Sequence, residues 1–148
     1  MIGDGPVDLL YTRGWLSNVE YAWESPDYAR FFTKLGRFSR LITFDKRGTC
    51  LSDRDVGYPT LEERSEDILT VLDAVGAKQV ALLGVSEGGT IAAVFAAMFP
   101  ERVKSLILYG TYARSKWAPD YPWGTKPEMA DRFIAEMRRN WGKPFDLD

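Results

Sequence analysis

The amino-acid sequence predicts an α/β fold, in which a parallel sheet of about four strands is covered by helices on both faces. Short apolar runs typical of buried strands occur at 7–11, 40–45, 80–85 and 105–109. Helical segments of suitable length separate these runs, which indicates right-handed crossover connections and therefore a parallel sheet. In such a sheet, the loops at the carboxyl ends of the strands hold the functional site.

Helix boundaries are marked by capping residues. The first helix is expected to begin with Ser25 as N-cap and Pro26 at the first helical position, and to end at Gly36. Thr60 and Glu63 form a capping box for the second helix. The expected apolar faces consist of Tyr28, Phe31, Phe32 and Leu35 in the first helix, and Ile68, Leu69, Val71, Leu72 and Val75 in the second.

The composition of the chain changes after the fourth expected strand. Residues 117–124 form an aromatic loop rich in proline and glycine. A last helix is expected to open near Pro127 and to be closed by Gly142 and Pro144. Its apolar residues are Met129, Phe133, Ile134, Met137 and Trp141.

Composition limits the class of protein. The chain has 148 residues, of which 45% are hydrophobic and 27% charged, as expected for one globular domain with a real core. A net charge of -2 without a basic run disfavours a nucleic-acid partner. No apolar stretch is long enough to span a bilayer.

Cysteine and histidine usage narrows the chemistry further. Cys50 is the single cysteine and the chain contains no histidine, which argues against a disulfide framework and against a transition-metal site. The first residues lack the basic-then-apolar pattern of a secretory signal. We therefore expect a cytoplasmic protein that needs no cofactor.

One turn has the pattern of a catalytic motif. Gly84-Val85-Ser86-Glu87-Gly88 joins the third strand to the following helix, as G-x-S-x-G requires. Ser86 is the candidate nucleophile, because so sharp a turn exposes its hydroxyl above the sheet edge. The backbone N–H of Glu87, at the positive helix end, would face an oxyanion formed there. The alternative is a turn that only packs a helix or binds phosphate, and the charge of Glu87 argues against phosphate.

Three motifs in order resemble the α/β-hydrolase superfamily over residues 7–112. They are Arg13-Gly14-Trp15 after the first strand, the 45–53 loop with its D-x-R-G pattern, and the turn around Ser86. Cys50 stands in the second motif where a glycine is usual. The sequence looks closest to a bacterial subgroup that occurs alone or fused to signalling domains such as adenylate cyclases.

This resemblance implies a carboxylesterase-like or lipase-like serine hydrolase that acts on carboxylic esters or related small acyl substrates. It implies Ser86 as nucleophile and an oxyanion hole made by the backbone N–H groups of Trp15 and Glu87. The strand order would be 40–45, 7–11, 80–85 and 105–109. Residues 1–114 would form a partial hydrolase core, and residues 115–148 the beginning of a helical cap or lid that could line an acyl pocket.

The sequence departs from the superfamily where its acid and histidine are usually found. The superfamily's acid usually follows a later strand and its histidine lies near the C-terminus. We expect this chain to end before either region, so that both residues are missing from it. We therefore expect an N-terminal half, truncated or completed by a second chain. A domain-swapped homo-oligomer is a further alternative, since the strands at 41–44 and 106–109 would otherwise leave open sheet edges.

The other reactive residues have structural explanations that we favour. Asp45, Arg47 and Asp53 are expected to brace their loop by ion pairs or hydrogen bonds, and Cys50 to be a small loop residue without a base partner. Asp120 is a weak candidate acid, for which a solvated loop residue is the favoured interpretation.

Three alternatives to this interpretation remain open. A lysine, Lys46 or Lys104, could serve as the base for Ser86, although no spacing supports such a pair. The protein could instead be a non-catalytic binding or regulatory module, or an inactive truncated product.

Overall fold

A computed structural model describes residues 1–143, and the chain divides into two compact units, Met1–Tyr112 and Ala113–Asp148. The expectation that Pro144 closes the last helix lies outside the described residues.

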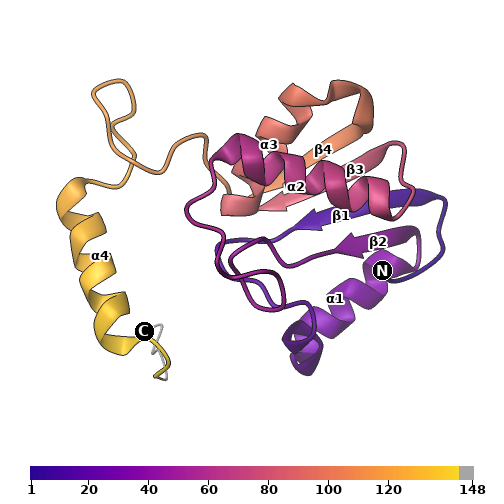
Figure 1. Cartoon of the computed structure of the whole chain (residues 1–148), viewed down its shortest axis with the longest axis horizontal. Coiled ribbons are helices and arrows are strands. Elements are labelled where there is room, and N and C mark those ends of the chain that lie inside the picture. The colour runs from indigo at the N-terminus through magenta and orange to yellow at the C-terminus, as the bar shows by residue number, and fades with distance from the viewer. Residues whose placement is uncertain (144–148) are drawn as a thin grey trace. The chain divides into compact units, whose positions relative to one another are not determined.

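The first unit is built on a four-stranded parallel sheet (Figure 1). Its strands are β1 (Val7–Thr12), β2 (Ser39–Thr43), β3 (Val80–Val85) and β4 (Val103–Tyr109), in the order β2-β1-β3-β4. In register, Leu10 of β1 lies opposite Ile42 on one side and Leu82 on the other. The predicted fold class, strand order and parallel direction are confirmed.

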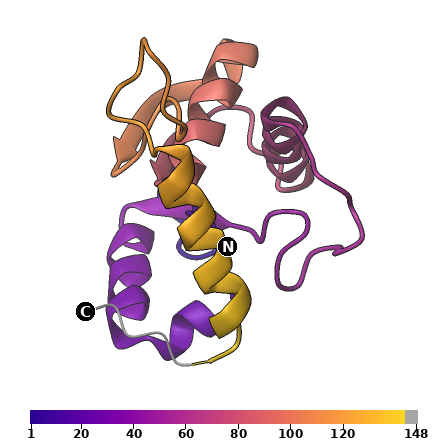
Figure 2. The same cartoon turned by 90° about the vertical axis from the view of Figure 1, so that its left-hand side faces the viewer.

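Helices cover both faces of this sheet. α1 (Pro26–Gly36) lies on one face, and α2 (Leu61–Ala74) and α3 (Glu87–Met98) pack on the other. Figure 2 shows α1 and α2 on opposite sides of the strands. Short 3-10 turns, η1 (Tyr21–Glu24) and η2 (Pro100–Arg102), precede α1 and β4.

Two apolar cores result from the alternation of side chains along β1. Leu10 points to the α2 and α3 side, whereas Leu9 and Tyr11 point to the α1 side, because successive strand residues face opposite ways. The larger core consists of Leu10, Ile42, Ile68, Leu72, Ala77, Val80, Leu82, Ile91, Ala92 and Phe95. The smaller core surrounds Phe32 of α1, which is 1% exposed.

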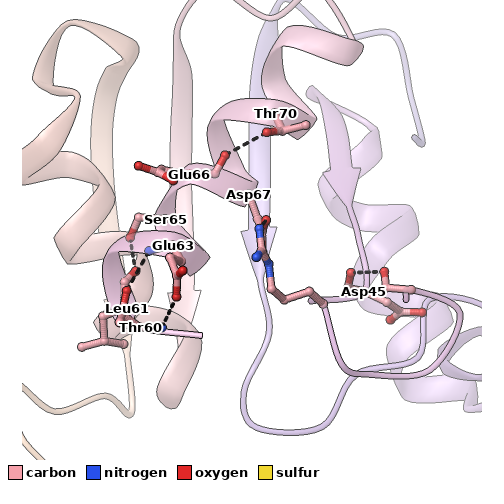
Figure 3. Close-up of polar contacts among 10 residues, drawn as sticks. Asp45, Thr60, Leu61, Glu63, Ser65, Glu66, Asp67 and Thr70 are labelled. Atoms are coloured by element: carbon pink, nitrogen blue, oxygen red, sulfur yellow. Dashed lines mark hydrogen bonds and ion pairs between the residues drawn. The ribbon is translucent and has the colours of Figure 1, made fainter. Parts of the chain in front are cut away.

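The helix starts agree with the sequence in part. Thr60 Oγ1 accepts a hydrogen bond from Glu63 N (3.2 Å) and Glu63 Oε2 accepts one from Thr60 N (2.7 Å), which confirms the capping box (Figure 3). Ser25 occupies the N-cap position of α1, but its side chain makes no capping hydrogen bond. Tyr28 and Phe31 are exposed, so the buried face of α1 is narrower than its apolar spacing predicts.

The two sheet edges differ. Side chains from Leu106 to Tyr109 of β4 are all exposed, with Tyr109 at 71%. At the other edge, Ile2 forms an antiparallel bridge with Leu41, with N–O distances of 2.9 and 2.8 Å. The expectation of an open edge along β2 is therefore wrong at Leu41, because the N-terminal segment supplies a backbone partner there.

The second unit contains one helix, α4 (Pro127–Asn140), in its described part. The preceding loop is tied by bridges between Lys116 and Thr125 and between Ala118 and Tyr121. The assignment of this unit as the start of a cap stays a prediction. Among the described residues, no helix has the length and apolarity needed to cross a membrane.

An ion pair joins the neighbouring strands β1 and β2. Arg40 Nε and Nη2 donate to the two carboxylate oxygens of Asp8 at 2.6 and 2.8 Å, and Nη1 donates to the Val75 carbonyl at 3.1 Å. Asp8 and Arg40 are register partners in β1 and β2, so the bidentate pair crosses the strands directly. The hydrogen bond from Arg40 lowers the pKa of Asp8 below its ordinary value of 3.8.

This pair predicts an acid-dependent loss of stability. Because the folded pKa of Asp8 is depressed, its contribution is present above about pH 4, the unfolded value, and is lost as pH falls through the folded pKa. We expect Asp8→Asn to lower the thermal midpoint at pH 7 and to flatten the fall of stability below about pH 4. The matched control is Asp27→Asn, which removes an exposed pair with Arg30. An Asp8→Asn curve that parallels the wild-type curve over this range would contradict the prediction.

Candidate active site

Ser86 lies at the junction of β3 and α3 in a strained backbone conformation. Its φ of 53° and ψ of -128° fall in a region that residues with a Cβ rarely adopt. The strain is sustained by hydrogen bonds on both sides of the residue. Ser86 N donates to the Tyr109 carbonyl (3.1 Å), and the Ser86 carbonyl accepts from Gly89 N (3.0 Å) and Thr111 Oγ1 (2.6 Å).

The glycines of the turn permit backbone approaches that no side chain would allow. A Cβ on Gly88 would lie 2.3 Å from the carbonyl oxygens of both Thr12 and Arg13 at the end of β1. A Cβ on Gly84 would lie 2.5 Å from Gly89 Cα. The first turn of α3 therefore sits directly on the ends of β1 and β3.

The loop after β1 lies against the serine. A Cβ on Gly14 would lie 3.3 Å from Ser86 Cβ and 3.7 Å from its Oγ. Trp15 is the next residue and is 48% exposed. The structure thus brings Ser86, Glu87 and the 13–15 loop together. The oxyanion roles of the Trp15 and Glu87 N–H groups stay predictions.

Glu87 is the centre of a charged cluster at this turn. Its Oε2 accepts from Lys46 Nζ (2.6 Å) and its Oε1 from Arg64 Nη1 (2.6 Å). Lys46 Nζ also donates to the Gly14 carbonyl (2.6 Å), and its side chain is only 7% exposed. Burial lowers the pKa of Lys46, and the Glu87 carboxylate opposes that shift by stabilising the ammonium.

Sequence reasoning missed two features of this arrangement. It did not anticipate the Lys46–Glu87–Arg64 cluster, although an acid directly after the serine and a lysine in the 45–53 motif were available signals. It also did not identify Thr111, whose hydroxyl donates to the Ser86 carbonyl, because the expected strand order brings the loop after β4 close to the turn without showing which of its side chains contacts Ser86.

The 45–53 loop is braced by contacts within it and by contacts with neighbouring segments. Asp45 Oδ1 accepts from Val19 N (3.1 Å), and its backbone carbonyl accepts from Ser52 Oγ (2.6 Å). Arg47 forms a bidentate pair with Asp67 of α2 and not with Asp45. These contacts agree with structural roles for both residues.

Asp53 contributes to the loop through its backbone, since its carbonyl accepts from Gly48 N at 2.7 Å. Between this loop and α2 lies an open hollow of about 490 Å³. Asp45, Arg47, Asp53 and Asp67 are among its lining residues, and Ser86 is not. The hollow therefore belongs to the braced loop and is separate from the serine.

The remaining candidate residues do not converge on Ser86. Lys104 is an exposed residue of β4, and no hydrogen bond joins Lys46 Nζ to Ser86 Oγ in the described part of the chain. The Asp120 side chain is 84% exposed and 3.7 Å from Arg114, as expected for a solvated loop residue. Within residues 1–143, no group of three or more acids, cysteines or histidines could hold a metal ion.

Comparison of this chain with known proteins identifies its fold family. Residues 13–147 match the model of the alpha/beta hydrolase fold family. Mouse serine hydrolase BPHL is 31% identical over 117 residues, covering 76% of this chain and 38% of the relative. The pimeloyl-acyl-carrier-protein methyl ester esterase of Neisseria meningitidis is 35% identical over 80 residues, covering 52% of this chain and 31% of the relative.

A solved structure leads to the same class. The esterase EaEST from Exiguobacterium antarcticum superimposes with a TM-score of 0.77 at 26% identity, over 94% of this chain and 50% of the esterase. The relatives are hydrolases and esterases of one superfamily. The chain belongs to the alpha/beta hydrolase fold family, and it spans half or less of the length of these relatives.

One residue of the second motif is strained. Cys50 has a φ of +46°, a left-handed conformation that suits the glycine usual at this position, and its Sγ contacts the Ser17 carbonyl. Cys50 is half-buried at this contact. Cys50 thus has a structural role in fixing the loop that also contains Lys46.

This strain predicts a difference between two substitutions that both remove the thiol. We expect Cys50→Gly to have an unfolding free energy about 1 kcal/mol higher than Cys50→Ala, because glycine adopts the left-handed region without a Cβ clash. Denaturant titration in reducing buffer measures both. Equal stabilities, or a more stable alanine variant, would show that the backbone at residue 50 is not strained in solution.

Proposed function

We propose that this chain is the nucleophile-bearing part of a serine hydrolase that cleaves carboxylic esters or related acyl compounds. Ser86 Oγ attacks the acyl carbonyl, and the backbone N–H groups of Trp15 and Glu87 bind the oxyanion of the tetrahedral intermediate. The alcohol then leaves, and water hydrolyses the acyl-serine.

The observation that supports this proposal most directly is the strained φ of Ser86 at a strand–turn–helix junction. A serine in that conformation presents its hydroxyl away from the sheet, with the first turn of α3 behind it. The contact of Gly14 with Ser86 brings the 13–15 loop to the same point. The names of the relatives, a serine hydrolase and a methyl ester esterase, agree with acyl transfer to a serine.

A serine hydroxyl needs a base, and these 148 residues contain no histidine. We propose that a histidine and its acid partner come from sequence outside them, either in a longer chain or in a complementing chain. The relatives are at least twice the length of the matched segment, which leaves room for both groups. The exposed β4 would be covered by that additional part or by a second copy of the chain.

We propose that the substrates are small acyl esters and that a cap begins at about residue 115. We also propose a cytoplasmic enzyme, because the single cysteine of the sequence is free.

The test compares the complete open reading frame that contains this chain with its Ser86→Ala variant. We expect the wild type to hydrolyse p-nitrophenyl acetate and to be labelled by a fluorophosphonate, and the variant to lose at least about 1,000-fold in rate and all labelling. Thr90→Ala, which removes a nearby hydroxyl bonded to the Tyr112 carbonyl, is the control and keeps both activities.

The absence of histidine favours one competing function, a non-catalytic module of the same fold. If the complete wild-type protein and its Ser86→Ala variant both show only background hydrolysis and no labelling, the result would support that module and reject the hydrolase.

A further inference from the structure

Lys46 connects the two segments that flank Ser86. Its ammonium donates to the Gly14 carbonyl and to the Glu87 carboxylate, each at 2.6 Å, and 7% of its side chain is exposed. A charged group so deeply buried is costly unless its hydrogen bonds are satisfied. Both partners therefore have a fixed position relative to Lys46.

The bond to Gly14 has a consequence for the next residue. The carbonyl of Gly14 and the N–H of Trp15 belong to the same planar peptide group, and none of the described peptide bonds is cis. In a trans peptide the C=O and N–H bonds point in opposite directions. An ammonium that fixes the Gly14 oxygen on one side thus fixes the direction of the Trp15 N–H on the other.

The bond between Lys46 and Glu87 holds the segment that directly follows Ser86. The Glu87 backbone N–H is the second expected oxyanion donor, and its side chain is held by Lys46 and Arg64 together. The three side chains have a net charge of +1, which favours a negative charge developing nearby. With its hydrogen bonds directed to a carboxylate and a carbonyl, Lys46 is poorly placed to accept a proton from Ser86.

We propose that Lys46 is a positioning residue of the oxyanion site, which aims the Trp15 N–H through the Gly14 carbonyl and aligns it with the Glu87 N–H. This assignment rests on the proposed function, since it gives a role to the same site. Lys46 touches neither substrate nor Ser86 and acts through the two segments that it holds.

The variants that test this role are Lys46→Met and Arg64→Met. The first removes the ammonium while keeping an unbranched apolar chain. The second is the matched control, because it removes the other cation bound to Glu87 and leaves the Gly14 contact intact. Glu87→Gln, which removes the charge that anchors Lys46, is the second variant in case Lys46→Met does not fold.

The first readout does not depend on catalysis. In the 148-residue chain, we expect the backbone amide resonance of Trp15 to shift in Lys46→Met and in Glu87→Gln, and to stay in place in Arg64→Met. An unchanged Trp15 resonance in Lys46→Met, or an equal shift in Arg64→Met, would overturn the assignment.

The second readout is the kinetics of the complete protein with p-nitrophenyl acetate. We expect Lys46→Met to lower kcat by about 10- to 100-fold with little change in KM, because a misdirected donor is lost chiefly to the transition state. Arg64→Met should lower kcat less than Lys46→Met, because it keeps the Lys46 contact with Gly14. A Lys46→Met enzyme with wild-type kcat would overturn the assignment while leaving the hydrolase intact. If wild type and Ser86→Ala are equally inactive, the proposed function fails instead, and the Trp15 resonance alone decides whether the Lys46 contact orients the peptide.

Discussion

The close seating of α3 on the ends of β1 and β3 is the constraint on which the rest of the structure depends. Gly88 lies so near the carbonyls of Thr12 and Arg13 that even one additional carbon would collide with both. This contact places Ser86 directly above the sheet and fixes the start of α3, whose residues Ile91 and Phe95 fill the larger core. The geometry of the Ser86 turn and the packing of the larger core thus depend on the same backbone contact.

The charged side chains at the Ser86 turn are paired with one another. A glutamate directly after the serine would repel a developing oxyanion if it were unpaired, but both its carboxylate oxygens are hydrogen-bonded to cations. The cations come from different segments, Lys46 from the loop after β2 and Arg64 from α2. The cluster thereby joins the loops after β1 and β2 to two helices around one serine. The Glu87 carboxylate, which would be unfavourable there if unpaired, thus links these segments.

The sequence was sufficient to predict the framework of the fold. Periodicity and capping residues located the strands and helices, and the capping box at Thr60 forms as expected. The order of the strands came from the family resemblance, which the structure confirms. These features are encoded locally, or by motifs whose order is shared across the family.

Contacts between distant segments were harder to predict. Arg47 pairs with Asp67, 20 residues away, and Ile2 pairs with the outer edge of β2. The Lys46–Glu87 bond joins residues 41 positions apart, so local sequence preferences do not identify the two residues as partners. Ser25 shows the reverse case, because a residue suited to capping occupies the right position without forming the bond. Side-chain partners depend on tertiary geometry, which local sequence preferences do not determine.

Comparison of Gly88→Ala with Gly14→Ala tests the central constraint most directly, through the unfolding free energy of each variant in denaturant. Alanine is the better helix former by about 1 kcal/mol, so helix propensity alone would make Gly88→Ala stabilising. The backbone contact predicts instead a loss of about 2 kcal/mol or more. For Gly14→Ala, whose Cβ would lie 3.3 Å from Ser86 Cβ, it predicts a smaller loss of about 1 kcal/mol or less. A Gly88→Ala chain as stable as wild type would show that α3 does not rest on the end of β1.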